Sequence, residues 1–571
     1  MNYSKHIRIL GLFLTFSGIL SAQIPEGFNK EQRESMQRLK AHVSYLASDE
    51  LQGRQTGSPG ELLSATYIAN EFKKNGLKLW GNNGFQEFTM TQFRLASDEC
   101  ILRLNPMGGA ISKAGPFEMN VDYYPLSQTA DLDSVTAETV DVGFGIISDK
   151  LGKNEFEGVD VKGKIALMRL GYFGQAENPH SELAQYADIN TKVENALKYG
   201  AAGIIFFRND SNESAPSGKL ERNVKPSPIP VFYFTHATPI PRGLTLTMKS
   251  KVITPQVKGH NVIGYKNNHR KKTVIICAHH DHIGFNEYDN SRYKGPQAIH
   301  NGADDNASGV AAMIELSKQL NKWGLRKNNY LFIAFSGEEL GLLGSKYFTK
   351  NPLIPLDKIN YVVNIDMLGR IDSTKKTLTI NGVGTASEWA EMLKKLETDS
   401  QNIRIATTES GLGPSDHASF YLENIPVLHF FSGQHRDYHT PDDDEDRINY
   451  QGMYHSLQAI KQIVCHSKKK KLNFVKTNDI SPGKMRFKVT LGVMPDYSFS
   501  GEGMRIDGVT PGRPAAAAGL QRDDVVIQMG DFPVKDMMGY MSALGKFEKG
   551  ETIPVTVIRN KGTYTVNVTF L

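Results

Sequence analysis

The chain has 571 residues, of which 40% are hydrophobic and 22% are charged, and this composition excludes a collagen, a coiled coil and a largely disordered protein. Its 66 Lys and Arg against 61 Asp and Glu leave a net charge of +5, too weak to indicate a nucleic-acid partner. Three cysteines are too few for a scaffold built on disulfides. At roughly 150 residues per domain, the length predicts about three or four domains.

Residues 1–22 have the layout of a secretory signal peptide. Lys5 and Arg8 precede an apolar run from Ile9 to Leu20, and small residues for cleavage follow. The run is shorter than the ~20 apolar residues that a membrane span needs, although an uncleaved anchor stays the alternative. We therefore expect an exported protein, periplasmic or extracellular, with no stable membrane span after cleavage.

The first half of the mature chain divides into two regions of different character. Residues 30–75 predict two helices around a glycine-rich turn at 52–60, because apolar residues recur there at helical spacing. Residues 96–255 contain short β-like runs broken by Gly and Pro. The strands predicted in this second region are 139–147, 165–169 and 203–207, with a helix at 190–199.

The region from 256 to 465 alternates apolar β-type runs with helical patterns. Four of the runs are nearly all apolar, as parallel strands buried on both faces are: 273–277, 330–335, 361–365 and 427–431. The fold class predicted is α/β, with a mostly parallel central sheet flanked by helices. Lys468–Lys471 indicates a solvated linker, and a separate small unit of short strands follows it.

Polar residues gather where the four apolar runs end. Ligands of an open α/β sheet bind outside the carboxyl ends of its strands, so these side chains are expected to converge. The segments concerned are Ala278-His279-His280-Asp281, Gly302 to Gly309, Ser336-Gly337-Glu338-Glu339, Asp366-Met367 and Tyr438-His439-Thr440-Pro441.

Two histidines and three carboxylates in one cleft would be costly to bury unless a cation neutralised them. A pair of Zn²⁺ ions meets this need, because zinc accepts imidazole and carboxylate ligands and one carboxylate can bridge two ions ~3.5–4 Å apart. A single Asp after a strand is more commonly a helix cap, and adjacent glutamates are favoured at any helix start. The presence of all five groups in order favours the metal centre.

These motifs resemble those of the exported di-zinc aminopeptidases, whose relatives include the glutamate carboxypeptidases, the transferrin receptors and the glutaminyl cyclases. The resemblance covers roughly residues 30–80 and 256–465 and implies the zinc-peptidase fold. Besides the segments above, it rests on Leu51-Gln52-Gly53-Arg54, Asn364-Ile365-Asp366-Met367 and Ser415-Asp416-His417.

The resemblance implies two Zn²⁺ per chain with Asp305 as the bridging ligand. It assigns His279 and Asp366 to one zinc together with Asp305, and Glu339 and His439 to the other. It also implies a cis peptide bond after Asp305.

Three further residues receive catalytic roles. Glu338, next to a ligand but free of the metal, suits the general base that takes a proton from water and passes it to the leaving amine. Asp281 suits a carboxylate that orients the imidazole of His279. Tyr438 is the candidate donor to the tetrahedral oxyanion, with a packing role as its alternative.

Two other regions resemble accessory domains. Residues 96–255 look like a protease-associated domain inserted in the peptidase, for which a lid or substrate-restricting role is the most that the residues imply. Residues 485–571 look like a PDZ domain, with Leu491-Gly492-Val493 as its carboxylate-binding loop. Because Thr490 replaces the usual first glycine of that loop, a peptide-binding groove and a scaffolding role both stay open.

The predicted organisation is a signal peptide at 1–22, a di-zinc peptidase domain at 23–95 and 256–466, a protease-associated insertion at 96–255, a linker at 467–484 and a PDZ-like domain at 485–571.

The predicted function is a zinc-dependent aminopeptidase acting on peptides, because the acid-rich motif segments favour a free α-ammonium group over a terminal carboxylate. The alternatives are a carboxypeptidase or dipeptidase of the same family, a glutaminyl cyclase with one zinc, and a non-catalytic receptor. Expected partners are peptide substrates and a peptide or protein ligand of the PDZ-like domain.

Overall fold

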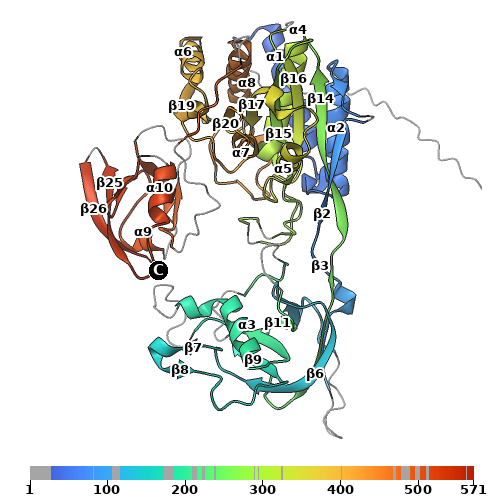
Figure 1. Cartoon of the computed structure of the whole chain (residues 1–571), viewed down its shortest axis with the longest axis vertical. Helices are drawn as coiled ribbons and strands as arrows, with labels where there is room; N and C mark the ends of the chain where they lie inside the picture. Colours follow the sequence, from blue (N-terminus) through green and yellow to red (C-terminus); the bar gives the residue numbers. More distant parts are fainter. Residues whose placement is uncertain are drawn as a thin grey trace, which may run out of the picture.

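In the computed structural model the chain forms three parts: one built on a large sheet, an inserted part at the other end of the molecule, and a C-terminal part to the side (Figure 1). No helix in the described part of the chain combines the length and the apolar character that crossing a membrane requires. The predicted signal peptide lies outside the described residues, as does most of the predicted linker. The structure describes residues 27–570 except 82, 106–115, 173–183, 209–214, 221–225, 237–239, 289, 294, 323–325, 400–401, 467–470, 478–488, 496–501, 510–512, 536 and 561.

The peptidase-like part is built on one large sheet, which has nine strands among the described residues. Its centre is formed by the four predicted apolar runs, which are parallel neighbours: β16 (Asn329–Phe335), β15 (Thr273–His279), β17 (Ile359–Ile365) and β20 (Val427–Phe431). Antiparallel pairs flank this centre, so the sheet as a whole is mixed. The flanking strands are β1 (Lys78–Leu79), β2 (Phe85–Thr91), β14 (Gln256–Lys266), β18 (Thr377–Asn381) and β19 (Arg404–Thr408).

Both faces of the central strands are covered, which explains why these strands are apolar throughout. Along β15, Val274 and Ile276 pack into the core on one face, whereas Ile275 and Cys277 pack into the core on the other. The first face is covered by α1 (Lys30–Leu46), α2 (Pro59–Lys74), α4 (Gly309–Lys322), α6 (Trp389–Asp399) and α8 (Tyr450–His466), and the second by α5 (Leu343–Lys350) and α7 (His417–Tyr421).

The predicted pair of N-terminal helices is present as α1 and α2. Asn29 caps α1 in a capping box, because its side chain accepts from the N–H of Gln32 and the Gln32 side chain accepts from the N–H of Asn29. Ser58 caps α2, which begins at Pro59, a residue that has no N–H to satisfy at a helix start. The turn between the helices contains the short helix η1 (Asp49–Arg54).

The inserted region forms a second sheet with its own core. Its strand order is β4 (Ile101–Leu104), β12 (Thr245–Ser250), β6 (Leu132–Asp141), β9 (Ile165–Arg169), β10 (Gly203–Phe207), β11 (Val231–Phe234) and β5 (Tyr123–Pro125), and α3 (Ile189–Lys198) packs on it. The prediction of a continuous strand over 139–147 is wrong at residues 142–146, because β6 ends at Asp141 and the short strand β7 (Ile147–Ser148) begins at Ile147. The chain turns there, because Gly143 and Gly145 have φ angles of +73° and +68°.

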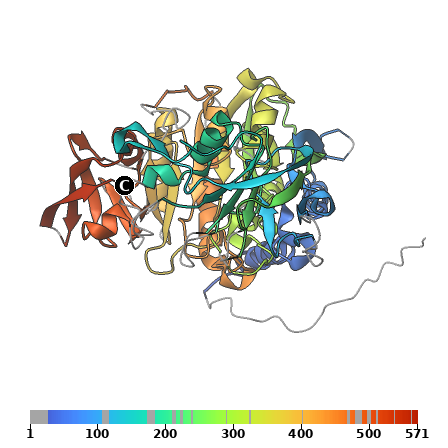
Figure 2. The same cartoon turned by 90° about the horizontal axis from the view of Figure 1, so that it is seen from below.

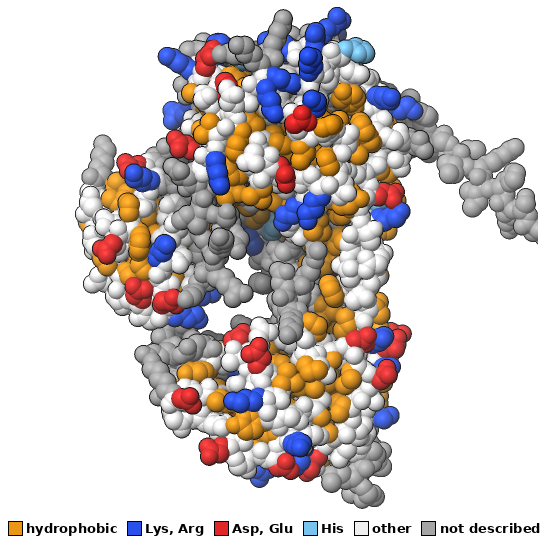
Figure 3. Space-filling model, viewed as in Figure 1, with side chains coloured by type: hydrophobic (Ala, Val, Ile, Leu, Met, Phe, Trp, Pro, Cys, Tyr) orange, Lys and Arg blue, Asp and Glu red, His pale blue; other side chains and the backbone are white. Residues whose placement is uncertain are grey.

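The inserted part lies at the far end of the molecule from the helices of the large sheet. It is reached through β2 and β14 and then through the small ribbon of β3 (Arg94–Leu95) and β13 (Val252–Ile253) (Figure 1). Figure 2, seen from below, shows the same part in front of the large sheet, with the C-terminal part to one side. On the face drawn in Figure 3, acidic and basic side chains are interspersed.

The C-terminal part has a separate hydrophobic core and its own sheet. Its described strands follow the order β21 (Val493–Pro495), β22 (Met504–Val509), β23 (Val525–Met529), β25 (Thr552–Arg559) and β26 (Gly562–Thr569), with β24 (Phe532–Pro533) paired to β23. Two short helices, α9 (Pro514–Ala517) and α10 (Met537–Leu544), complete it.

The described part of the predicted linker, residues 471–477, packs on the large sheet's domain. Leu472 is buried, and its N–H donates to Oδ1 of Asn360 over 2.9 Å. The N–H of Val475 donates to the carbonyl of Thr385 over 2.8 Å. These contacts make residues 471–477 an extension of that domain.

We predict that a chain ending at Thr477 is more stable than a chain ending at His466, although both lack the C-terminal domain. Burial of the Leu472 side chain alone accounts for about 2 kcal/mol, to which its hydrogen bond to Asn360 adds. Urea unfolding of the two truncates measures the difference. Equal midpoints would show that residues 471–477 contribute nothing to the fold.

Candidate metal centre

The five residues implied as zinc ligands converge at the carboxyl ends of the parallel strands. His279 ends β15, Asp366 directly follows β17, and Glu339 follows β16 by four residues. Asp305 lies in the helical turn η5 (Ala303–Ser308), which leads into α4, and His439 lies in the loop after β20. Parallel strands bring these positions together because all of their carboxyl ends lie at one edge of the sheet.

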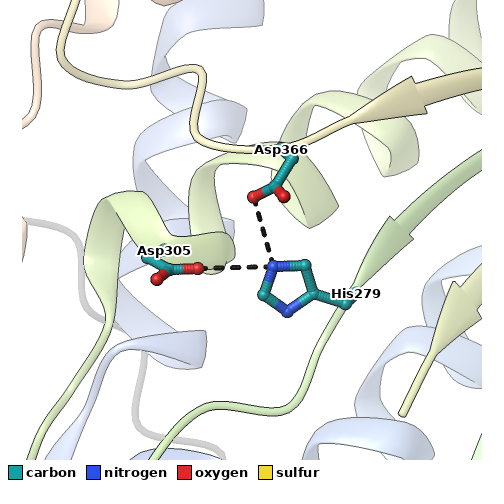
Figure 4. Close-up of side chains that lie close together, drawn as sticks. All are labelled: His279, Asp305 and Asp366. Atoms are coloured by element: carbon teal, nitrogen blue, oxygen red, sulfur yellow. Dashed lines mark hydrogen bonds and ion pairs between the residues drawn. The ribbon is translucent and has the colours of Figure 1, made fainter. Parts of the chain in front are cut away.

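The first group consists of His279, Asp305 and Asp366 (Figure 4). Nε2 of His279 lies 3.3 Å from Oδ1 of Asp305 and 3.2 Å from Oδ1 of Asp366. Ligand atoms that share one tetrahedral zinc at bond lengths of about 2.0–2.1 Å are separated from each other by roughly 3.3 Å. The spacing of this group therefore fits a single zinc ion.

The second group uses the other oxygen of Asp305. Nε2 of His439 lies 3.2 Å from Oδ2 of Asp305 and 3.2 Å from Oε2 of Glu339. The two carboxylate oxygens of Asp305 thus face different histidines. This is the arrangement in which one carboxylate bridges two ions. The peptide bond between Asp305 and Asn306 is cis, as the resemblance implies.

Backbone carbonyls orient both histidines. Nδ1 of His439 donates to the carbonyl oxygen of Asn290 over 3.0 Å. Nδ1 of His279 lies 3.2 Å from the carbonyl oxygen of Asp281. Because a carbonyl only accepts, the hydrogen of each neutral ring is held on Nδ1, and Nε2 is left with a free lone pair facing the carboxylates.

The carboxylate of Asp281 is shared among three neighbours. Its Oδ1 lies 3.7 Å from Nδ1 of His279, which is farther than the carbonyl of the same residue. Oδ1 accepts from the N–H of Glu338 over 3.2 Å, and Oδ2 accepts from the hydroxyl of Thr56 over 2.9 Å. The carboxylate of Asp281 therefore binds the backbone of Glu338, the expected general base, more closely than it approaches the ring of His279.

The buried carboxylates of the cluster need positive charge nearby to balance them. Burial opposes protonation of His439, yet the carboxylates of Glu339 and Asp305 raise its pKa to about 11. Burial likewise opposes protonation of His279, but Asp366, Glu338 and other carboxylates raise its pKa well above the usual value. Without another cation, the histidines carry protons that neutralise the carboxylates. Metal ions at the same positions would replace those protons.

Glu338 and Tyr438 lie beside the cluster without belonging to either group. Burial, together with the carboxylates of Asp366, Glu339 and Asp416, raises the pKa of Glu338, and His279 opposes this shift. The ring of Tyr438 stacks on His439 with 3.9 Å between centroids. Burial and the nearby carboxylates also raise the pKa of the Tyr438 phenol, which keeps its hydroxyl protonated and able to donate.

His282 is a functional candidate that the sequence analysis missed. Its Nδ1 lies 2.8 Å from Oε1 of Glu339 and 3.8 Å from Oδ2 of Asp305, so these three residues also form a group that could hold a metal. The 2.8 Å spacing is that of a hydrogen bond and is shorter than the edge of a zinc tetrahedron. His282 therefore fits a donor that orients Glu339. Its place in the same His-His-Asp-His stretch as His279 was the available signal.

Asp443 is a second candidate that the analysis missed. Its carboxylate accepts from the N–H of Asp304 over 3.1 Å and from the N–H of Asp305 over 3.0 Å. The side chain is fully buried, and burial with the charge of Asp304 raises its pKa to about 6. Asp443 thus holds the backbone that carries the bridging carboxylate. Its position four residues after His439 was a signal in the sequence.

Comparison with known proteins identifies the domain that carries this cluster. Residues 261–464 match the model of peptidase family M28. These residues form an M28 peptidase domain. Residues 135–238 match the PA domain, and residues 474–570 match the PDZ domain, in agreement with the resemblances of the inserted and C-terminal parts.

Proteins similar to part of this chain include bacterial aminopeptidases. Aminopeptidase YwaD of Bacillus subtilis (strain 168) is 24% identical over 473 residues, which cover 80% of this chain and 91% of that protein. An aminopeptidase of Pseudomonas aeruginosa is 28% identical over 335 residues, 55% of this chain and about half (54%) of its own length. The solved structure of BSAP, a zinc aminopeptidase from Bacillus subtilis, has a TM-score of 0.50 at 22% identity and covers 77% of this chain and 98% of its own. This last likeness supports a shared fold.

We predict that zinc binding to the metal-free M28 peptidase releases about two protons per chain near neutral pH, because zinc must displace protons held on His279 and His439. Zinc affinity should therefore rise with pH. The protonated His439 stabilises the metal-free fold, and this stabilisation is present below pH 6.5 and is lost as the pH rises toward about 11. Titration calorimetry in buffers of different ionisation enthalpy counts the protons. Binding without proton release would contradict the charge balance described above.

Proposed function

We propose that this M28 peptidase is an exported, zinc-dependent aminopeptidase that removes residues from the N-terminus of peptides. The observation that carries the proposal is the position of Asp305. One of its oxygens lies 3.3 Å from Nε2 of His279, and the other lies 3.2 Å from Nε2 of His439. A receptor that had lost its ligands, or a cyclase with one zinc, has no need for two such groups around a shared carboxylate.

The proposed ligands of two Zn²⁺ ions follow from these groups. His279, Asp305 and Asp366 would hold the first ion, and Asp305, Glu339 and His439 would hold the second. When bound, the zinc pair supplies Lewis acidity that makes water a nucleophile near neutral pH. His282, at 2.8 Å from Glu339, would hold the orientation of that ligand.

Glu338 is the proposed general base. It is 9% exposed, follows β16 next to the ligand Glu339 in sequence, and its N–H is held by Asp281. Its carboxylate would take the proton of the attacking water and deliver it to the leaving amine. Burial and the surrounding carboxylates raise the pKa of Glu338 above its usual value, so its carboxylate accepts a proton more readily than that of an exposed glutamate.

Tyr438 is the proposed donor to the oxyanion. Its ring is fixed by stacking on His439, and its hydroxyl stays protonated among the carboxylates of Asp305 and Glu339. A positioned donor of this kind stabilises charge that develops only in the transition state.

The charges around the site favour a substrate with a free amine. Arg370 and Arg436 are the cations nearest to the ligands in sequence, and both are engaged by Asp437. Nη2 of Arg370 donates to Asp437 over 2.7 Å, and Nε of Arg436 donates to the other oxygen over 3.1 Å. A carboxypeptidase needs such a cation for the terminal carboxylate of its substrate. The excess of carboxylates suits an α-ammonium group instead.

The accessory domains and the export signal complete the proposal. Lys219 of the PA domain donates to the carbonyl of Asn286, in the loop whose Asn290 orients His439. This contact supports a substrate-restricting role for the PA domain next to the site. For the PDZ domain we propose a peptide or protein ligand, and for residues 1–22 a cleaved signal peptide that leads to the periplasm or the exterior.

We predict that Glu338→Gln retains zinc and lowers kcat by about 10²–10⁴-fold, because the amide cannot accept the proton of water. Glu339→Ala serves as the contrast, since it should weaken zinc binding itself. Metal content after dialysis and steady-state kinetics separate the two variants. A Glu338→Gln enzyme that turns over peptide at the wild-type rate would exclude this residue as the base.

The aminopeptidase assignment is tested with matched substrates. We expect hydrolysis of unblocked aminoacyl substrates. The rate should be at least about 100-fold lower once the amine is acetylated, because the acetylated nitrogen carries no positive charge for the acid-rich site to bind. Chelation should abolish both activities, and added Zn²⁺ should restore them. Equal rates on free and acetylated peptides, or release of residues from the carboxyl end, would replace the assignment with another peptidase class.

A further inference from the structure

The Leu51-Gln52-Gly53-Arg54 motif supplies no residue of the proposed mechanism, yet it ends in an unusual residue. The side chain of Arg54 is buried, at 1% exposure. Among the described residues it forms no ion pair with a carboxylate. A buried arginine without an ionic partner is rare, because burial of an unpaired charge is costly.

Backbone carbonyls take the place of a carboxylate around Arg54. Its Nε donates to the carbonyl of His280 over 2.9 Å. One terminal nitrogen, Nη1, donates to the carbonyls of Asn301, over 2.7 Å, and of Leu46, the last residue of α1. The other, Nη2, donates to the carbonyl of Gly302 over 3.1 Å. The planar fork of one guanidinium thus joins three separate segments.

Two of these segments carry the proposed zinc ligands. His280 directly follows His279 in the chain, and Asn301 and Gly302 directly precede the turn that contains Asp305. The distance between Nε2 of His279 and Oδ1 of Asp305 is 3.3 Å. Arg54 therefore binds the backbone close to His279 and also the backbone close to Asp305, two members of the first metal group.

The backbone of Gly53 and Arg54 also binds the loop that follows β15. The carbonyl of Arg54 accepts from the N–H of His282 over 3.2 Å, and the carbonyl of Gly53 accepts from the N–H of Gly284 over 3.1 Å. Gly53 has a φ of +68°, and a Cβ at this position would lie 2.5 Å from the carbonyl oxygen of His300. This close approach explains why glycine precedes the arginine.

The charge of Arg54 acts on the cluster from a distance. Burial lowers its pKa to about 10, and the charges of Asp305, Asp281, Asp443 and Glu339 oppose this shift. The guanidinium stays protonated at neutral pH, so it contributes a fixed positive charge behind the carboxylates. Its hydrogen bonds to carbonyls offset the loss of hydration.

We propose that Arg54 is a positioning residue that sets the separation of His279 and Asp305, and thereby the geometry in which two zinc ions share Asp305. The inference rests on the proposed zinc pair. Lysine could not replace it, because an ammonium group is a compact donor that cannot span carbonyls on three segments in one plane.

The test compares Arg54→Lys and Arg54→Met with Arg38→Met in the full-length protein. Arg38 also ties α1 to the core, through two hydrogen bonds of 2.8 and 2.7 Å to Glu315 of α4, but Glu315 lies ten residues beyond Asp305, and the Arg38 bonds end on its side chain rather than on the backbone next to a ligand. Zinc affinity is measured by competition with a chromophoric chelator, the geometry of the site by the visible spectrum of the Co²⁺ form, and stability by thermal unfolding of the metal-free protein.

We expect Arg54→Lys to fold, to bind zinc at least 10-fold more weakly than the wild type, and to change the Co²⁺ spectrum. Arg38→Met should lower the unfolding temperature while it leaves zinc affinity and spectrum unchanged. Wild-type zinc affinity and an unchanged spectrum in Arg54→Lys, or in Arg54→Met, would overturn the inference. Failure of both Arg54 variants to fold would also overturn it, because a purely structural role would then account for the residue. A wild-type protein that binds no zinc would instead reject the proposed function.

Discussion

Neutralising a group of buried carboxylates is the constraint on which the rest of this peptidase domain depends. Asp305, Glu338, Glu339 and Asp366 meet at one edge of the sheet, where little water is left to screen them. Their mutual repulsion must be balanced by protons on the histidines, by metal ions or by fixed cations. The carboxylates raise the pKa values of His279 and His439 for this reason, because a protonated imidazole balances their negative charge.

Hydrogen bonds to the main chain, made between distant parts of the sequence, hold the cluster in place. The carbonyl of Asn290 orients His439, the carboxylate of Asp443 holds the backbone of Asp305, and Arg54 binds the carbonyls that flank the first metal group. A metal site requires ligand positions to be kept within a few tenths of an ångström. Backbone contacts meet that requirement because the backbone has fewer soft torsions than side chains do.

The residues of the proposed mechanism all lie in one of the three domains. The M28 peptidase domain contains every residue of the proposed mechanism, whereas the PA domain reaches the site through the contact of Lys219 with the loop at Asn286. The PDZ domain has a separate core, and residues 471–477 are bound to the peptidase domain rather than to the PDZ core. The accessory domains therefore supply none of the residues of the proposed site.

The sequence by itself determined the α/β class, the four buried parallel strands and the residues at their carboxyl ends, because all-apolar runs and strand-end polar residues are local patterns. It did not reveal the antiparallel flanks of the sheet, the end of β6 at Asp141 or the packing of Leu472, since these depend on partners far along the chain. Only the tertiary structure gave the distances from Asp305 to both histidines, and only it placed His282 beside Glu339, Asp443 at the backbone N–H of Asp305 and Arg54 on the carbonyls of His280, Asn301 and Gly302. Distances between groups that lie dozens or hundreds of residues apart follow from how the strands and loops pack, and no spacing in the sequence encodes them.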